Sequence, residues 1–117
     1  ASKPNPAQMT FGEQIAHIAN ANAFFIGVVT GEKSPVSKPA KMDKASVVAM
    51  LNTSFDWVIQ SVEKLTPAQL EKVVDTPDGR MSGAEAVMFA LDHTTSHRGQ
   101  CIVYLRVKDI APPEYQF

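Results

Sequence analysis

Apolar residues recur at helical spacing along three long stretches of the chain. In the first stretch the apolar positions fall mostly three or four residues apart, which places them on one face of a helix. These positions are Phe11, Ile15, Ile18, Phe25 and Val29. Thr10 and Glu13 have the spacing of a capping box, in which each side chain accepts a hydrogen bond from the backbone N–H of the other residue. The pattern predicts a helix that begins after Thr10 and ends near Thr30 and Gly31.

A second apolar stripe follows Asp43, which is a residue type favoured at the N-cap of a helix. Between the two stripes, residues 31–42 contain two prolines and three lysines and show no apolar period, so we predict a linker there. The stripe predicts a second helix, and its apolar members are Val47, Leu51, Phe55, Val58, Val62 and Leu65.

The last third of the chain has two further helix starts. Thr66, followed by a proline and by Gln69, predicts a short helix to about Val74, and the letters "DTPDG" after it are typical of a turn. Ser82 has a glutamate three residues later and predicts a long helix to about Lys108. No segment has strand-like residues with turn signals on both sides. We therefore expect an all-α protein.

The composition indicates a single domain over residues 1–117, with an N-terminal loop at residues 1–9. The net charge is −1 and no cluster of lysines and arginines forms a stripe, which argues against nucleic acid as a partner. No apolar run approaches the roughly 20 residues of a membrane span. The start of the chain resembles neither a signal peptide nor a transit peptide, and there is only one cysteine. These features predict a cytoplasmic protein without a membrane partner.

The stretch "HTTSHRGQC" at residues 93–101 contains most of the candidate chemistry. His93 and His97 lie four residues apart on the predicted helix, which is about 6 Å along its axis with roughly 40° of rotation. Both imidazoles therefore project to one side and could bind one metal ion. The alternative is that they are histidines of the core or surface with ordinary hydrogen-bond partners.

His17 lies in the first predicted helix among small residues, and it strengthens the metal interpretation. Two facing helices that supply one and two histidines would form a three-nitrogen site with open positions for water or substrate. That arrangement is typical of catalytic metal sites. Glu13 could accept a hydrogen bond from a ligand, although the capping box explains it as well.

The cysteine and one acidic residue offer weaker candidates. Cys101 lies about 12 Å along the helix axis from His93 and is rotated by roughly 80°, so both cannot share a metal without distortion. A cysteine–histidine nucleophile remains an alternative, but a buried, unreactive cysteine is favoured because no positioned base is evident. Asp56 interrupts the second apolar stripe. It is either solvated or a carboxylate that orients a histidine ring.

The segments "MTFGEQIAHIANAN" and "DHTTSHRGQCIVYLRVKDIAPP" resemble the DinB-like (damage-inducible, YfiT-type) superfamily, and the likeness covers nearly the whole chain. The resemblance implies a four-helix bundle in which His17, His93 and His97 bind a divalent metal, usually zinc or nickel. Members of the family normally begin with a further long helix. Here three long helices and a short one are expected, which suggests a shortened form or a homodimer in which a partner covers the exposed face.

Characterised relatives in this superfamily include metal-dependent transferases and isomerases that use low-molecular-weight thiols. The resemblance therefore implies a metal-dependent enzyme, such as a thiol S-transferase or a hydrolase-like enzyme, with a small-molecule thiol as partner. Gln100, Asp56 and Tyr104 are candidate catalytic residues, chosen because of the sides of the helices on which they are expected to lie. The alternative is a non-catalytic metal-binding bundle with a structural or sensing role.

Overall fold

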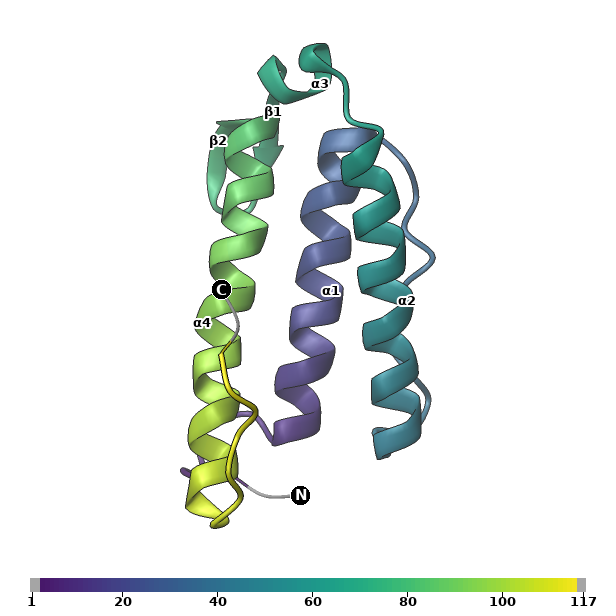
Figure 1. Ribbon diagram of the computed structural model, residues 1–117. Coiled ribbons are helices and arrows are strands. Elements are labelled where there is room, and N and C mark those ends of the chain that lie inside the picture. Colours follow the sequence, from purple (N-terminus) through teal and green to yellow (C-terminus); the bar gives the residue numbers. More distant parts are fainter. Residues whose placement is uncertain (1–2, 116–117) are drawn as a thin grey trace.

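Three long helices lie side by side, with α1 between α4 and α2 (Figure 1). The structure is a computed structural model, and it describes residues 3–115. The helices are α1 (Phe11–Thr30), α2 (Lys44–Glu63), α3 (Pro67–Glu71) and α4 (Gly83–Val107). The predicted all-α class, with three long helices and a short one, is confirmed. No helix among the described residues is both long and apolar enough to cross a membrane.

Each helix begins at the N-cap residue that the sequence predicts. Thr10, Thr66 and Ser82 all form complete capping boxes, and the Asp43 side chain accepts a hydrogen bond from the backbone N–H of Ser46 at 2.9 Å. These caps provide partners for backbone N–H groups that have none inside the helix. At the other end of α1, Gly31 adopts the left-handed conformation that favours glycine, with φ of 74°.

A two-stranded antiparallel hairpin precedes α4, and its strands are β1 (Val73–Thr76) and β2 (Gly79–Ser82). The expectation that no segment forms a strand was therefore wrong, and the short helix ends at Glu71 instead of near Val74. Strands of four residues are too short to show a clear apolar alternation. The hairpin packs the β-branched side chain of Val74 into the core, which gives the extended conformation its tertiary support. The turn within "DTPDG" is confirmed, and it joins the two strands.

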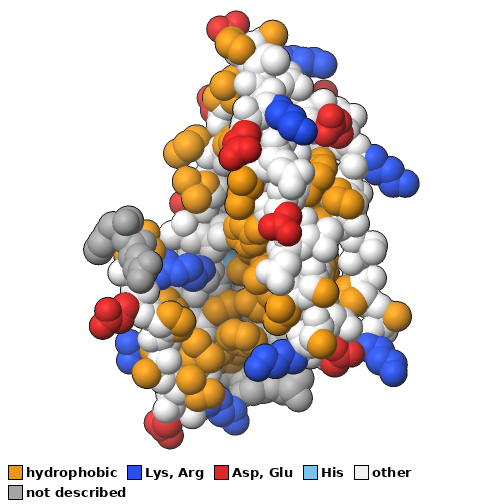
Figure 2. Space-filling view, turned by 45° about the vertical axis from the view of Figure 1, so that its right-hand side comes forward, with side chains coloured by type: hydrophobic (Ala, Val, Ile, Leu, Met, Phe, Trp, Pro, Cys, Tyr) orange, Lys and Arg blue, Asp and Glu red, His pale blue; other side chains and the backbone are white. Residues whose placement is uncertain are grey.

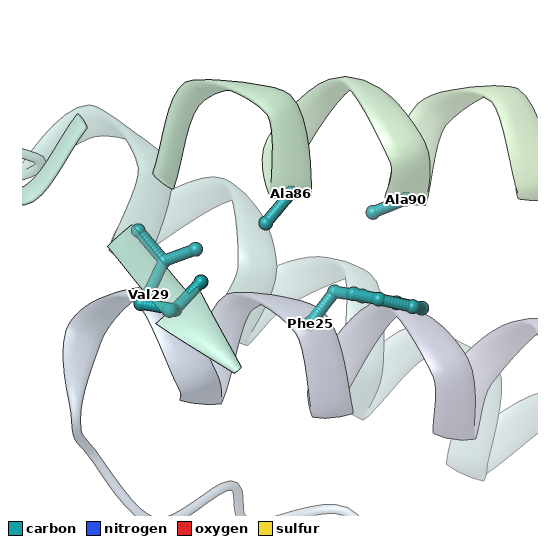
Figure 3. Packing of buried hydrophobic residues seen from close by; sticks show 5 residues of the cluster. Phe25, Val29, Ala86 and Ala90 are labelled. Atoms are coloured by element: carbon teal, nitrogen blue, oxygen red, sulfur yellow. The ribbon is translucent and has the colours of Figure 1, made fainter. Parts of the chain in front are cut away.

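The core is built mainly between α1 and α4. Figure 3 shows Phe25 and Val29 of α1 pointing toward Ala86 and Ala90 of α4, and Val74 of the hairpin completes this cluster. Alanine is small enough to let the two helices approach closely, because its side chain adds only one methyl group to the interface. The tight contact between α1 and α4 fixes how the side chains farther along these helices face one another.

The contact between α1 and α2 also uses small residues. Ala16 and Ala19 pack against Met50, and the Ser54 hydroxyl, which is fully buried, donates a hydrogen bond to the backbone carbonyl of Ala19 at 2.7 Å. This bond gives a buried polar group its partner and also fixes the register of α2 against α1. As a result, α1 is held on both sides.

Substitution of Gly83 should test how closely α4 approaches the preceding short helix. A Cβ atom at this position would lie 2.0 Å from the backbone carbonyl oxygen of Gln69 and 3.1 Å from the Cα atom of Leu70. We expect Gly83→Ala to lower the free energy of unfolding by about 1–3 kcal/mol, because backbone atoms must move to accommodate the methyl group. Chemical denaturation monitored by circular dichroism measures this change.

The matched control is Gly99→Ala in the same helix, where a Cβ atom would meet no other atom within 4 Å. There the free energy of unfolding should rise by roughly 0.5–1 kcal/mol, because alanine loses less backbone entropy in a helix than glycine does. Equal effects of the two substitutions would contradict the packing described.

Candidate metal centre

His17 is positioned on α1 by close packing on either side of it. Ala16 and Ala19 are buried, while the imidazole itself is partly exposed. The small neighbours hold the backbone of α1 against the adjacent helices and leave the larger ring at a cleft. The position of His17 is thus set by the same packing that forms the core.

His93 and His97 project from α4 toward His17. The Nε2 atoms of His93 and His17 lie 3.0 Å apart. The ring centroids are 4.7 Å apart for His17 and His93, 4.5 Å for His17 and His97, and 4.3 Å for His93 and His97. One nitrogen from each ring can be chosen such that all three lie within 4.8 Å of one another. This histidine cluster could hold a metal ion.

Gln14 connects the histidine cluster to the interior of the bundle. It lies on α1 one turn before His17, and only 1% of its surface is exposed. Its Oε1 atom lies 2.7 Å from Nδ1 of His97, and its Nε2 atom donates to Oε1 of Gln100 at 3.0 Å. Because Oε1 of Gln14 can only accept, Nδ1 of His97 must carry the proton. The lone pair of His97 is therefore on Nε2, the nitrogen left free for a metal.

Tyr104 extends this hydrogen-bond network to the N-terminal loop. Its hydroxyl accepts a hydrogen bond from Nε2 of Gln14 at 3.4 Å and donates to the backbone carbonyl of Met9. A second bond braces the same pair of helices next to His93, where the Thr94 hydroxyl donates to Oδ1 of the buried Asn22 at 2.8 Å. Each bond joins α4 to a segment that is distant in sequence, so several hydrogen bonds hold the elements around the histidine cluster in place.

The environment of His93 and His97 favours neutral rings at these two positions. Burial lowers the pKa of His93, and the neighbouring His17 lowers it further, whereas the Asp78 carboxylate raises it. Burial also lowers the pKa of His97, with smaller contributions from His93 and His17. A neutral imidazole has a lone pair available for a metal, whereas a protonated one has none. The lowered pKa values of His93 and His97 therefore favour the form of these two rings that metal binding requires.

The donor set suits a divalent cation for a second reason. Nε2 of His93 and Nε2 of His17 face each other, and Nδ1 of His93 is buried without a hydrogen-bond partner among the described residues. Two facing imidazole nitrogens can share one proton, but a shared cation would satisfy both lone pairs and also engage His97. Imidazole nitrogens are common ligands of zinc and of other divalent transition metals. The residues present thus fit a metal of this kind.

Two clefts meet at the histidine cluster, and both are lined by His17 and Asn20. The first, which we call the lysine cleft, has a volume of about 530 Å³ and lies between α1, the N-terminal loop and the linker. The second, the aromatic cleft, has a volume of about 380 Å³ and lies between α1, α4 and the hairpin turn. A molecule in either cleft could therefore reach His17.

The other sequence-predicted candidates occupy different places. Gln100 and Tyr104 both belong to the network around Gln14. Asp56 is exposed on α2, and α1 lies between that helix and α4 (Figure 1). Cys101 is buried, and burial raises the pKa of its thiol, which is the opposite of what an activated nucleophile requires. Glu13 accepts a hydrogen bond from the N-cap backbone of α1 at 2.7 Å, as the capping box predicts.

Sequence reasoning missed Gln14. A glutamine near the start of an amphipathic helix normally faces solvent, so its residue type alone does not indicate burial. The available signal was its position three residues before His17, which places both side chains on the same side of α1. Glu13, the residue considered for a supporting role, is exposed, and its carboxylate is engaged with the N-cap of α1.

Comparison with known proteins agrees with this architecture. The DinB-like protein YjoA from Bacillus subtilis, solved by crystallography, is similar in structure with a TM-score of 0.76 and 24% sequence identity. The similarity covers 99% of this chain and 78% of that protein. Comparison with curated protein sequences finds no match. The sequence profile of the DinB superfamily matches residues 2–101, and the chain therefore belongs to the DinB superfamily.

Proposed function

We propose that this protein is a metal-dependent S-transferase that uses a small thiol, with zinc or nickel held by His17, His93 and His97. The observation that carries the proposal is the convergence of three histidines beside two clefts that both include His17 in their lining. Three protein ligands are typical of catalytic zinc sites, in which further positions serve water or substrate. A divalent ion would supply the positive charge that favours the ionised form of a thiol.

The lysine cleft supports a thiol that carries negative charge. Lys3 and Lys38 line it, and the single carboxylate in the lining, that of Glu13, is engaged with the N-cap of α1. The two lysines also contribute to lowering the pKa of Glu13, after its hydrogen bonds to Thr10. They would bind and orient carboxylate groups of the thiol with its sulfur toward His17. Met42 and Met50 provide an adaptable apolar wall beside them.

Gln14 has a positioning role in this proposal. It holds the His97 ring through Nδ1, and Gln100 and Tyr104 in turn hold the Gln14 amide. A ligand ring whose second nitrogen is fixed in this way loses little freedom when it binds a metal. We infer that Gln100 and Tyr104 act through Gln14 and do not contact the substrate.

Metal binding should depend on the histidines directly and on Gln14 indirectly. We expect His93→Ala to abolish stoichiometric binding of zinc or nickel, because two nitrogens remain. Gln14→Leu should weaken binding by about 10- to 100-fold, since loss of the partner of a ligating histidine has effects of this size. Gln14→Glu keeps an acceptor for His97 and should restore most of the affinity. Calorimetric titration of untagged protein with each metal gives these affinities.

Cys101→Ala is the matched control, because it changes a buried residue of the same helix that is not a proposed ligand. It should bind metal as the parent protein does, and circular dichroism should show that all variants are folded. If folded His93→Ala bound metal as tightly as the parent, the proposed ligand set would be wrong.

Transfer activity should depend on charge in the lysine cleft. We expect Lys38→Ala to raise the KM for a dicarboxylate thiol severalfold with little change in kcat, because it removes a binding charge distant from the reacting sulfur. The measurement is the transfer of a panel of small thiols to a chromogenic electrophile by metal-loaded protein. Lys33→Ala, in the same linker but outside the cleft lining, is the control and should have no effect. If every thiol is inert, the non-catalytic metal-binding bundle is the better account.

We also propose that two copies of the chain associate through an apolar groove between α1 and α2. Figure 2 shows hydrophobic side chains gathered in a hollow on the lower part of one face. A groove of about 390 Å³ is lined almost entirely by apolar side chains, which include Phe11, Ile15, Val48 and Leu51. Large exposed apolar patches are typical of contact surfaces. A second copy offers the same surface, as a two-fold contact requires.

Association of two copies is expected in sedimentation equilibrium at tens of micromolar protein. Val48→Glu should shift the equilibrium toward monomer, because it places a charge in the groove, where Val48 is 45% exposed. Ile59→Glu changes an apolar residue of α2 that is 54% exposed and lies outside the groove lining, and it should leave the mass unchanged. A parent protein that is monomeric throughout would contradict this part of the proposal.

A further inference from the structure

The aromatic cleft has a lining unlike that of the lysine cleft. Phe24, Phe25 and Phe89 line it together with His17 and His93. The ring centroids of Phe25 and Phe89 are 4.9 Å apart, and those of Phe24 and Phe25 are 5.5 Å apart with the rings nearly perpendicular. Phe25 is anchored in the core, where Figure 3 shows it pointing between α1 and α4. Its two aromatic neighbours therefore rest on a rigid support.

Two of these rings present apolar surface to the cleft. Phe24 is 44% exposed and Phe89 is 36% exposed, and both lie beside the histidine cluster. Exposed aromatic rings that converge at one place form a surface on which a flat apolar molecule can stack. The two exposed phenylalanines are not isolated on the surface, because they share a cleft with His17 and His93.

The hairpin turn limits which molecules the aromatic cleft would accept. Pro77 and Asp78 also line it, and none of the described lysines or arginines does. The Thr76 hydroxyl donates to the backbone carbonyl of Gly79 at 2.8 Å and accepts from the backbone N–H of Asp78 at 3.2 Å, which fixes the turn. The carboxylate of Asp78 would repel an anionic ligand. The cleft therefore suits an uncharged molecule, in contrast to the lysine cleft.

We propose that the aromatic cleft binds the electrophilic substrate, a planar, uncharged aromatic compound, while the thiol occupies the lysine cleft. This inference rests on the proposed function. His17 and Asn20 line both clefts, so the two molecules would meet at the histidine cluster. The opposite electrostatic character of the clefts would direct each substrate to its own side.

The reaction with a nitroaryl chloride illustrates the step. The thiol first gives up its proton to water, and the thiolate sulfur then attacks the ring carbon that carries chlorine. The sulfur–carbon bond forms, the carbon–chlorine bond breaks, and chloride leaves with the bonding electron pair. No oxidant or reductant takes part. The chain's contribution is to hold the ring against Phe24 and Phe89 with its reacting carbon toward the histidines.

Binding of 2,4-dinitroaniline tests the inference without requiring turnover, because this planar compound lacks the leaving group. We expect Phe89→Ala and Phe24→Ala each to weaken its binding by roughly three- to tenfold, the range expected from loss of one aromatic contact. Calorimetry or NMR titration measures the affinity, in the presence and absence of metal. Met88→Ala is the matched control, since Met88 is exposed on α4 next to Phe89 but outside the cleft lining. It should bind as the parent does.

Separate measurements distinguish failure of this inference from failure of the proposed function. If the parent binds metal and thiol but dinitroaniline binding is absent, or is unchanged in both phenylalanine variants, the assignment of the aromatic cleft is overturned. If metal binding fails while dinitroaniline binding still depends on Phe89 and Phe24, the transferase proposal falls and the assignment of the cleft is supported. Should Phe89→Ala change only the sedimentation behaviour and not the affinity, the aromatic surface is a protein contact and the inference is wrong.

Discussion

The close contact between α1 and α4 determines both the core and the candidate metal centre. Ala86 and Ala90 of α4 pack against Phe25 and Val29 of α1, so the two helices approach with only methyl groups on one side. His93 and His97 follow further along the same helix, and the close approach brings His17 within reach of both. Larger residues at the alanine positions would separate the helices and with them the histidines. The histidine cluster is therefore a consequence of helix packing and not of a local loop conformation.

Hydrogen bonding refines what the packing establishes. A buried amide must satisfy its donors and acceptor, because an unpaired polar group in the interior costs free energy. Gln14 does so by linking His97, Gln100 and Tyr104, and this requirement simultaneously fixes the His97 ring and its tautomer. Stability and site geometry thus depend on the same bonds. His93 differs, since its Nδ1 atom has no partner among the described residues, and its orientation depends on packing and on its contact with His17.

The helices could be predicted because their signals are local. Residue type and spacing identify all four N-caps in the sequence, and the structure confirms each of them: Thr10, Asp43, Thr66 and Ser82. The hairpin could not be predicted in this way, because four-residue strands carry little pattern and Val74 becomes extended only through its tertiary contacts. The four-residue spacing predicted that His93 and His97 lie on one side of α4. The burial of Gln14 could not be predicted in this way, because its hydrogen-bond partners belong to α4 and not to its own helix. The two clefts depend on the linker and on the hairpin turn, whose positions no periodic pattern specifies.

The partial burial of the histidines meets two requirements of the proposed metal site. Burial lowers the pKa of His93 and His97, which keeps the rings neutral and reduces competition between protons and metal. Complete burial would achieve this more strongly but would also separate the histidines from the two clefts. The bundle instead places α1 at the centre, so that one side of it carries the cluster between the lysine cleft and the aromatic cleft. Because α1 provides His17 and Asn20 to both clefts, His17 is accessible from two clefts whose remaining lining residues differ.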